Sequence, residues 1–279
     1  MADLHPMELG EILDGALTIY RRHLGLFVKI GVVALWLPVA LTIYIQLAGG
    51  VEQHLGLWFL AYVIGYFANV FMTAASIRVI SDSYLGRLPD LAEALSFGTS
   101  KIWPLFAVWL GKGIILVLLM LVVVVLASLA GPALVGGGGS AGALLIVLLA
   151  ILGGCWFVLF VMCGYAVTTP VVVLENLGGA FDAFGRSWDL TRGFKVKLFV
   201  IWVIALLVVY VPILALAALG GYFSVVVPWA GHATQIFSAL LPMLVYPIFS
   251  CILTLMYYDL RVRREAFDLQ VLGQQLGIS

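Results

Sequence analysis

A single lysine inside a long apolar segment is the first residue whose type and position suggest chemistry. Lys112 lies nine residues after Trp103, which is about 13 Å along an α-helix that rises 1.5 Å per residue. If Trp103 marks the membrane interface, the ammonium group approaches mid-bilayer, where a cation costs at least about 2.5–3.5 kcal/mol and usually marks a functional pathway. In the alternative interpretation the span begins later, and Lys112 reaches back to the cytoplasmic surface.

Asn69 is the second polar candidate and lies halfway along another apolar segment. It shares a helical strip with Ala61, Gly65 and Thr73, a spacing of small residues that favours close packing of two helices. We interpret Asn69 chiefly as a packing residue; in the alternative interpretation its amide bonds across helices or near Lys112. Lys112 and Asn69 together form the candidate intramembrane polar site.

Charged residues near the ends of apolar segments have structural and lipid-binding interpretations. Glu175 is expected to pair with Arg186 or Arg192 and so to fix the angle between two helices, with an ion site as the alternative. Asp259 and the arginines after it are typical of an interfacial anchor, and such basic groups also attract anionic headgroups by about 1 kcal/mol each. The predicted contacts to lipid headgroups or a partner are Arg21, Arg22, Arg261, Arg263 and Arg264.

The chain lacks the residue arrangements of common enzymes and metal sites. Its four histidines have no ligand spacing, and its three cysteines lie inside apolar runs without a CxxC pair. The sequence contains no Gly-x-Ser-x-Gly, no HExxH and no paired intramembrane carboxylates. We therefore expect no catalytic residues, no metal and no cofactor, and we do not expect an enzyme.

Composition places the chain in a membrane. Of its 279 residues 64% are hydrophobic and 10% are charged, whereas a soluble domain is about 45–50% apolar and about 25% charged. The apolar runs reach the roughly 20 residues that a membrane-spanning helix needs. The expected fold is an all-α integral membrane protein with a single polytopic domain over residues 1–279. The net charge of zero gives no reason to expect nucleic acid.

The expected elements are six membrane-spanning helices and three amphipathic helices on the membrane surface. The spans are residues 24–48, 57–80, 103–130, 143–173, 194–220 and 236–258, and the surface helices are residues 7–22, 89–101 and 178–193. An amphipathic tail follows over residues 261–279. The fourth span is too long for a straight crossing, so Pro170 is expected to break it as a hinge. The hydroxyls of Thr168 and Thr169 would bond the carbonyls that the proline frees.

Basic residues define an orientation. All 14 lysines and arginines fall on one side or inside a span, so the positive-inside rule predicts cytoplasmic N- and C-termini in the cell membrane. The acidic N-terminus lacks the basic region and cleavage site of a signal peptide, so no segment is expected to be removed.

The chain also shows a possible internal repeat of surface helix, span and span. Aligning Ala16, Ala94 and Ser187 brings EILDGALTIYRRHLGLF, DLAEALSFGTSKIWPLF and AFGRSWDLTRGFKVKLF into register. The predicted units are residues 7–80, 89–175 and 178–260, all in the same orientation. In the alternative interpretation, any membrane hairpin with a basic entry gives this pattern without duplication.

Three stretches resemble a known family. They are PVVVLENLGGAFDAFGRSWDLTRG, GEILDGALTIYRRH and YYDLRVRREAFDLQ, and they are similar to the glycerophosphoryl diester phosphodiesterase membrane domain over essentially the whole chain. The resemblance implies a bacterial inner membrane and the membrane half of that family only. The catalytic half would need an α/β barrel and metal-binding His and Glu residues, for which this chain has no room, so no phosphodiesterase activity is implied.

Two functions follow as expectations. The first is a non-enzymatic module that binds membrane lipids, or scaffolds a protein partner or a second copy, through its cytoplasmic surface helices. The second is a small transporter or channel with a polar path near Lys112 and Asn69. An intramembrane enzyme has only isolated polar residues in its favour.

Overall fold

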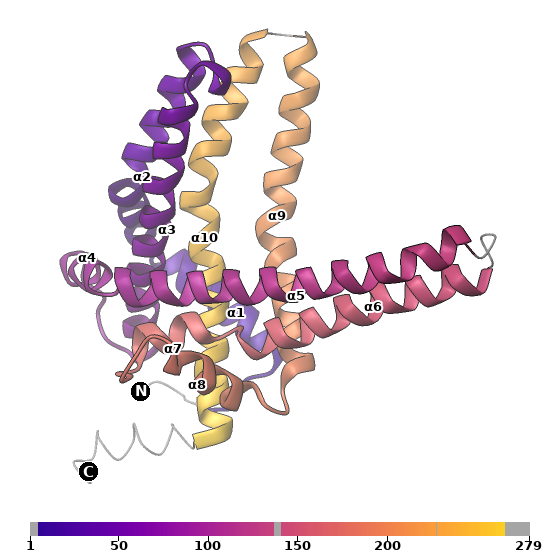
Figure 1. The fold of residues 1–279 in the computed structure, drawn as a ribbon. Helices are drawn as coiled ribbons and strands as arrows, with labels where there is room; N and C mark the ends of the chain where they lie inside the picture. The colour runs from indigo at the N-terminus through magenta and orange to yellow at the C-terminus, as the bar shows by residue number, and fades with distance from the viewer. Residues whose placement is uncertain (1–4, 137–140, 227, 266–279) are drawn as a thin grey trace.

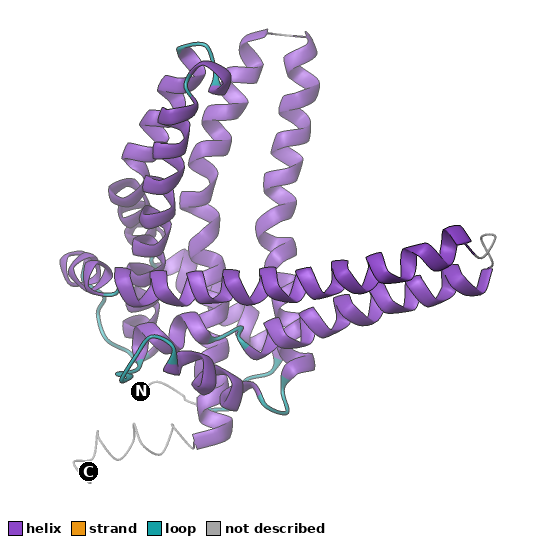
Figure 2. Cartoon of the chain, viewed as in Figure 1, coloured by secondary structure: helices purple, strands orange, loops and turns teal. Residues whose placement is uncertain are grey.

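The fold is built from helices throughout the part of the chain that the structure describes. The computed structural model describes residues 5–136, 141–226 and 228–265, and every regular element in these ranges is helical (Figure 2). The elements are α1 (Leu9–Arg22), α2 (Leu24–Leu47), the 3₁₀ turn η1 (Val51–Gln53), α3 (Leu55–Tyr84), α4 (Leu91–Ser100), α5 (Ile102–Gly136), α6 (Ala141–Gly164), α7 (Thr168–Leu174), α8 (Asp182–Thr191), α9 (Lys195–Val226) and α10 (Pro228–Glu265).

Six segments are long and apolar enough to cross a membrane, as the sequence predicts. They lie in α2, α3, α5, α6 with α7, α9 and α10. The chain is therefore a multi-pass α-helical membrane protein. Of the predicted amphipathic tail, only residues 261–265 are described, as the end of α10; the remainder lies outside the described residues.

The six long helices do not all run in one direction. In Figure 1, α2, α3, α9 and α10 stand side by side, whereas α5 and α6 form a hairpin that projects across them. Among the upright helices, α10 packs against α9, α2 and α3. Distance along α5 is therefore no measure of depth along the upright helices. The separation of about 13 Å between Trp103 and Lys112 is a distance along α5 alone, and the depth of Lys112 in a membrane stays a prediction.

The three predicted surface helices are present as α1, α4 and α8, and they gather with α7 at one end of the upright helices (Figure 1). We call this the charged end, because ion pairs concentrate there. Each of the three short helices packs on the chain itself: α1 on α10, α4 on α3 and α8 on α7. Their apolar faces are thus covered by protein, with Ile12, Ala94 and Ala183 fully or almost fully buried.

This packing links the three predicted repeat units in a ring. Each unit is a short helix followed by two long helical segments: α1 to α3, α4 to α7, and α8 to α10. The short helix of each unit contacts the last helical segment of the preceding unit, and α1 of the first unit contacts α10 of the last. Positions that coincide in the sequence alignment are also buried alike, all at 0–1% exposure: Ala16 with Ala94 and Ser187, Phe27 with Leu105 and Leu198, and Ile30 with Val108 and Ile201. An origin of the units by duplication stays a prediction.

The break in the fourth long segment lies upstream of the predicted hinge. Helix α6 ends at Gly164 and α7 begins at Thr168, so the break precedes Pro170, which lies within the first turn of α7. A proline ring clashes with the carbonyl four residues before it and donates no N–H, which interrupts the helix one turn earlier. The Thr168 hydroxyl and its backbone N–H both donate to the carbonyl of Tyr165, at 2.8 and 3.3 Å, within the break itself. The carbonyl that Pro170 frees is that of Ala166, so the predicted bond from Thr168 to the freed carbonyl is not the one formed.

Helix α8 packs closely against α6 at Gly164. Its carbonyl accepts hydrogen bonds from the hydroxyls of Ser187 at 2.9 Å and Thr191 at 3.2 Å. A Cβ at this position would lie 2.3 Å from the ring of Trp188, which is far inside van der Waals contact. Only glycine therefore lets α8 dock here.

The substitution Gly164→Ala should destabilise the protein by about 1–3 kcal/mol, because overpacking forces the Trp188 ring out of its position. Thermal unfolding in detergent, followed by size-exclusion chromatography, measures the loss as a lower Tm. Gly153→Ala on the same helix is the matched control, since a Cβ there meets nothing within 4 Å. Equal Tm values for both variants would contradict this account of the α6–α8 contact.

Candidate functional site

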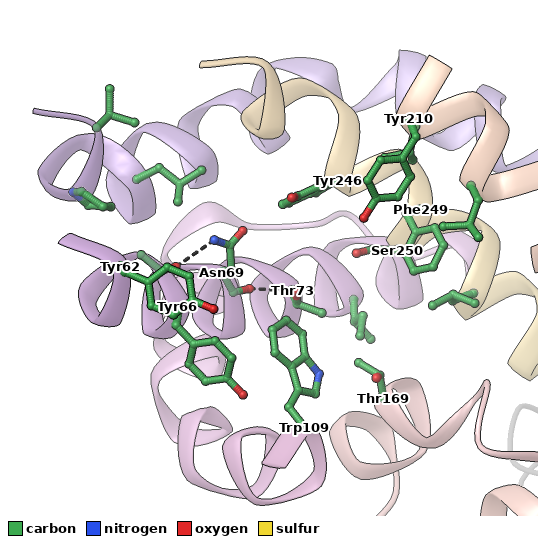
Figure 3. Close-up of a pocket in the computed structure, with 18 of the residues that line it drawn as sticks. Tyr62, Tyr66, Asn69, Thr73, Trp109, Thr169, Tyr210, Tyr246, Phe249 and Ser250 are labelled. Carbon is green, nitrogen blue, oxygen red and sulfur yellow. Dashed lines mark hydrogen bonds between the residues drawn. The ribbon is translucent and has the colours of Figure 1, made fainter. Parts of the chain in front are cut away.

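A cavity of about 700 Å³ lies between α2, α3, α5, α7, α9 and α10 (Figure 3). Its size falls within the range of pockets that bind small organic molecules. Eight of its lining residues are aromatic: Trp58, Tyr62, Tyr66, Trp109, Trp202, Tyr210, Tyr246 and Phe249. Among the residues that line it, all within the described ranges, none is Asp, Glu, Lys, Arg or His. The cavity is therefore mostly apolar and carries no formal charge on its walls.

Asn69 lines this cavity and has a hydrogen-bonding group left over. Its Nδ2 donates to the carbonyl of Gly65 at 2.8 Å, and its own backbone carbonyl accepts from the Thr73 hydroxyl at 2.8 Å (Figure 3). Both bonds stay within α3, so the expected bond across helices is not formed. The side-chain Oδ1 is buried and has no hydrogen-bond partner among the described residues. A buried acceptor without a partner costs free energy.

Lys112 reaches the cavity through one of its lining residues. Its ammonium group donates to the hydroxyl of Thr169 at 3.3 Å, and the Thr169 side chain is buried and lines the cavity. Lys112 itself is half-buried and is not a lining residue. The two residues of the predicted polar site therefore meet the same cavity from different walls, Asn69 directly on α3 and Lys112 through Thr169 on α7.

A second group of polar residues lies at the charged end. Glu175 accepts from Arg186 Nε at 2.8 Å and from Nη2 at 3.2 Å, and its Oε1 also accepts from the Tyr257 hydroxyl at 2.9 Å. Arg186 bonds Glu265 as well, and Arg261 Nε contacts Glu265 at 3.1 Å. Hydrogen bonds to Glu265 and then Glu175 hold the pKa of the Arg186 guanidinium above its usual value. This network joins α7, α8 and α10.

Asp259 forms the most buried charge cluster of the charged end. Its side chain is 0% exposed, and it accepts from Lys197 Nζ at 2.6 Å, from Arg263 Nε at 2.9 Å and from the backbone N–H of Met7 at 2.8 Å. Lys197 and Arg263 also donate to the Met7 carbonyl, at 2.7 and 2.8 Å. The cluster therefore fixes the chain segment before α1 against α9 and α10. Asp259 is thus an internal structural centre, and its role as an interfacial anchor stays a prediction.

The positions of the predicted basic contacts divide them into two classes. Arg261 and Arg263 form the internal ion pairs described above, and Arg264 donates to the carbonyl of Arg192. Each of the three has a partner within the protein, while Arg263 and Arg264 also stay exposed. Arg21 and Arg22 are exposed at the end of α1, where a lipid headgroup has access to them.

The predicted ion pair of Glu175 with Arg186 is present. Arg192, the alternative partner, instead accepts a hydrogen bond from Arg264 through its backbone carbonyl.

Sequence reasoning missed the aromatic cavity, although a signal for it exists. Trp58, Tyr62 and Tyr66 continue the helical strip of Gly65, Asn69 and Thr73 along α3. Large rings alternating with small residues on one helix face indicate a hollow beside it.

Comparisons with known proteins do not add to this geometry. No family model matches the chain, and neither the curated proteins nor the solved structures compared with it give a match. The resemblance to the glycerophosphoryl diester phosphodiesterase membrane domain stays a prediction.

The substitution Asp259→Asn should destabilise the protein by about 3 kcal/mol, because it leaves Lys197 and Arg263 beside a neutral group in a largely buried site. Thermal unfolding in detergent measures the change. Glu93→Gln is the control: its pair with Arg78 lies at an exposed position, so it should cost below about 1 kcal/mol. If the two variants unfold at the same temperature, the Asp259 cluster does not carry the stability assigned to it.

Proposed function

We propose that the protein is a non-enzymatic membrane module that binds a lipid-like molecule inside the membrane, in the cavity between the upright helices. The observation that carries this proposal is the cavity of about 700 Å³ with eight aromatic residues and no formally charged residue on its walls. Apolar pockets with a few convergent polar groups are the default binding sites of proteins. Lipid is the most abundant apolar molecule available to a cavity within spanning helices.

The proposal moves the lipid site away from the surface helices. The apolar faces of α1, α4 and α8 are covered by the chain's own helices, and Arg261, Arg263 and Arg264 are engaged internally. Arg21 and Arg22 remain available as headgroup contacts. In this proposal the charged end faces the cytoplasm of a cell carrying the protein in its plasma membrane, and it is the surface for a protein partner or a second copy.

The substitution Gly65→Phe should remove bound lipid. Gly65 lines the cavity, and a Cβ there meets only Pro38 at an ordinary distance of 3.5 Å, so the added ring fills space that a ligand would occupy. Native mass spectrometry of protein released from lipid nanodiscs measures the fraction of molecules that retain one lipid class. We expect that fraction to fall about tenfold, the change that about 1.4 kcal/mol produces.

Gly56→Phe is the matched control for this experiment. Gly56 also lies on α3, and a Cβ there meets nothing within 4 Å. This variant should retain the lipid of the unaltered protein, and both variants are compared at equal thermal stability. Equal lipid retention by the two variants, or only bulk lipid on the unaltered protein, would remove the cavity from the function.

Transport is the second candidate, and the contact between Lys112 and the cavity residue Thr169 favours it. A cation close to an intramembrane cavity is typical of a polar path. Proteoliposomes that contain a fluorescent NBD-labelled lipid report transbilayer movement as fluorescence lost on adding dithionite. Lys112→Met should slow this movement at least several-fold, and Lys29→Met, at an exposed lysine of α2, should not. A rate equal to that of protein-free liposomes would exclude transport of this lipid.

A further inference from the structure

The polar groups of the cavity specify the chemistry of its occupant more closely than its size does. We infer that the ligand is an uncharged membrane molecule with a hydroxyl group, a lipid alcohol, whose hydroxyl donates to Asn69 Oδ1. This inference rests on the proposed function, since it names the class of molecule that the same cavity binds. Four features of the cavity carry it.

The first feature is the absence of charge on the cavity walls. Tyrosine, which is neutral at pH 7, is the one ionisable residue type among the lining residues in the described ranges. An ionised group moved into such surroundings loses its hydration without gaining an opposite charge. The nearest cation, Lys112, directs its ammonium group to Thr169. A charged headgroup is therefore a poor occupant, and the buried part of the ligand is neutral.

The second feature is the unpaired hydrogen-bond acceptor of the Asn69 side chain. Nδ2 donates one of its two N–H groups to Gly65, and the backbone carbonyl accepts from Thr73, whereas the acceptor Oδ1 has no partner at all among the described residues. Only a donor satisfies an acceptor. A hydroxyl group meets this requirement, whereas a quaternary ammonium, which aromatic cages also bind, has no hydrogen to donate and would leave Oδ1 unpaired.

The third feature lies on another helix of the cavity wall, at Thr169 of α7. Because its oxygen accepts from Lys112 at 3.3 Å, its own hydrogen points elsewhere and is available to a ligand oxygen. Figure 3 shows Thr169 and Asn69 on separate helices around the same hollow. Asn69 and Thr169 thus offer an acceptor and a donor at separate positions. An uncharged molecule with oxygen atoms satisfies both of them.

The fourth feature is the aromatic lining. Aromatic side chains pack well against rings and unsaturated chains, because their faces and edges carry complementary partial charges. Trp109, Tyr66 and Phe249 present rings from three different helices around the polar groups (Figure 3). The apolar body of the ligand is therefore expected to be unsaturated or cyclic, with the hydroxyl at Asn69.

The test compares an alcohol with its methyl ether. The full-length protein in nanodiscs is labelled with a photoreactive diazirine analogue of geranylgeraniol, and the labelled residues are found by peptide mass spectrometry. Unlabelled geranylgeraniol and its methyl ether then compete; the ether accepts hydrogen bonds but cannot donate one. The alcohol should compete about tenfold better than the ether, because only the alcohol satisfies Asn69 Oδ1.

Two variants locate the effect. In Asn69→Leu the preference for the alcohol should disappear, since the acceptor is gone. In Thr42→Val the preference should persist, because the Thr42 hydroxyl lines the cavity but already donates to the Pro38 carbonyl at 2.8 Å. If Asn69→Leu does not fold, the comparison of alcohol and ether on the unaltered protein decides the question by itself.

The outcomes separate this inference from the proposed function. Equal competition by alcohol and ether at the cavity overturns the hydroxyl assignment and leaves lipid binding in place. A preference that survives in Asn69→Leu also overturns it. Photolabelling that avoids every cavity residue overturns the inference, and the Gly65→Phe measurement then shows independently whether another lipid occupies the cavity.

Discussion

A carboxylate without access to solvent holds the two ends of this chain together. Asp259 near the end of α10 receives hydrogen bonds from Lys197, Arg263 and the backbone of Met7. A buried charge is tolerated only when its partners are all in place. This requirement ties the start of the chain to α9 and α10, and it fixes the position at which α1 covers α10. The ring of units closes where α1 packs on α10, and this cluster fixes that contact.

The charged end and the cavity have contrasting physical characters. At the charged end, Glu175, Arg186 and Glu265 connect α7, α8 and α10 through ion pairs and short hydrogen bonds. Around the cavity the walls are aromatic and uncharged, and the described polar groups bond mostly within their own helices, as Asn69 and Thr73 do. Polar cross-links therefore determine how the helices are held at one end, while the space between them is left to a ligand.

The sequence predicts the helices well because hydropathy and helical spacing are local properties. The six long apolar segments, the three amphipathic helices and the pair of Glu175 with Arg186 all follow from residue types a short distance apart. Hydropathy gives the length of a helix but no direction, which is why the crosswise position of α5 and α6 was not predicted. The depth of Lys112 depends on that direction, so it stays a prediction.

The roles of individual polar residues were harder to predict because their partners are distant in sequence. Arg263 looks like a headgroup contact when only its neighbours are considered, but its partners include Met7. Lys112 and Thr169 are 57 positions apart, and nothing local indicates that they meet. The cavity needs six helices from across the chain. Features of this kind depend on tertiary packing, and a single sequence does not contain them in readable form.

The contact between α1 and α10 has a consequence for the order of assembly. Met7 and Asp259 are 252 positions apart, and translation at about 5–20 residues per second puts roughly 10–50 s between their syntheses. During that interval the apolar face of α1, with Ile12 and Ala16, has no protein partner from α10. The membrane surface is an apolar environment that can shelter this face until α10 is made. Helix α1 therefore begins as a surface helix, as its sequence suggests, and becomes part of the protein core when the last helix arrives.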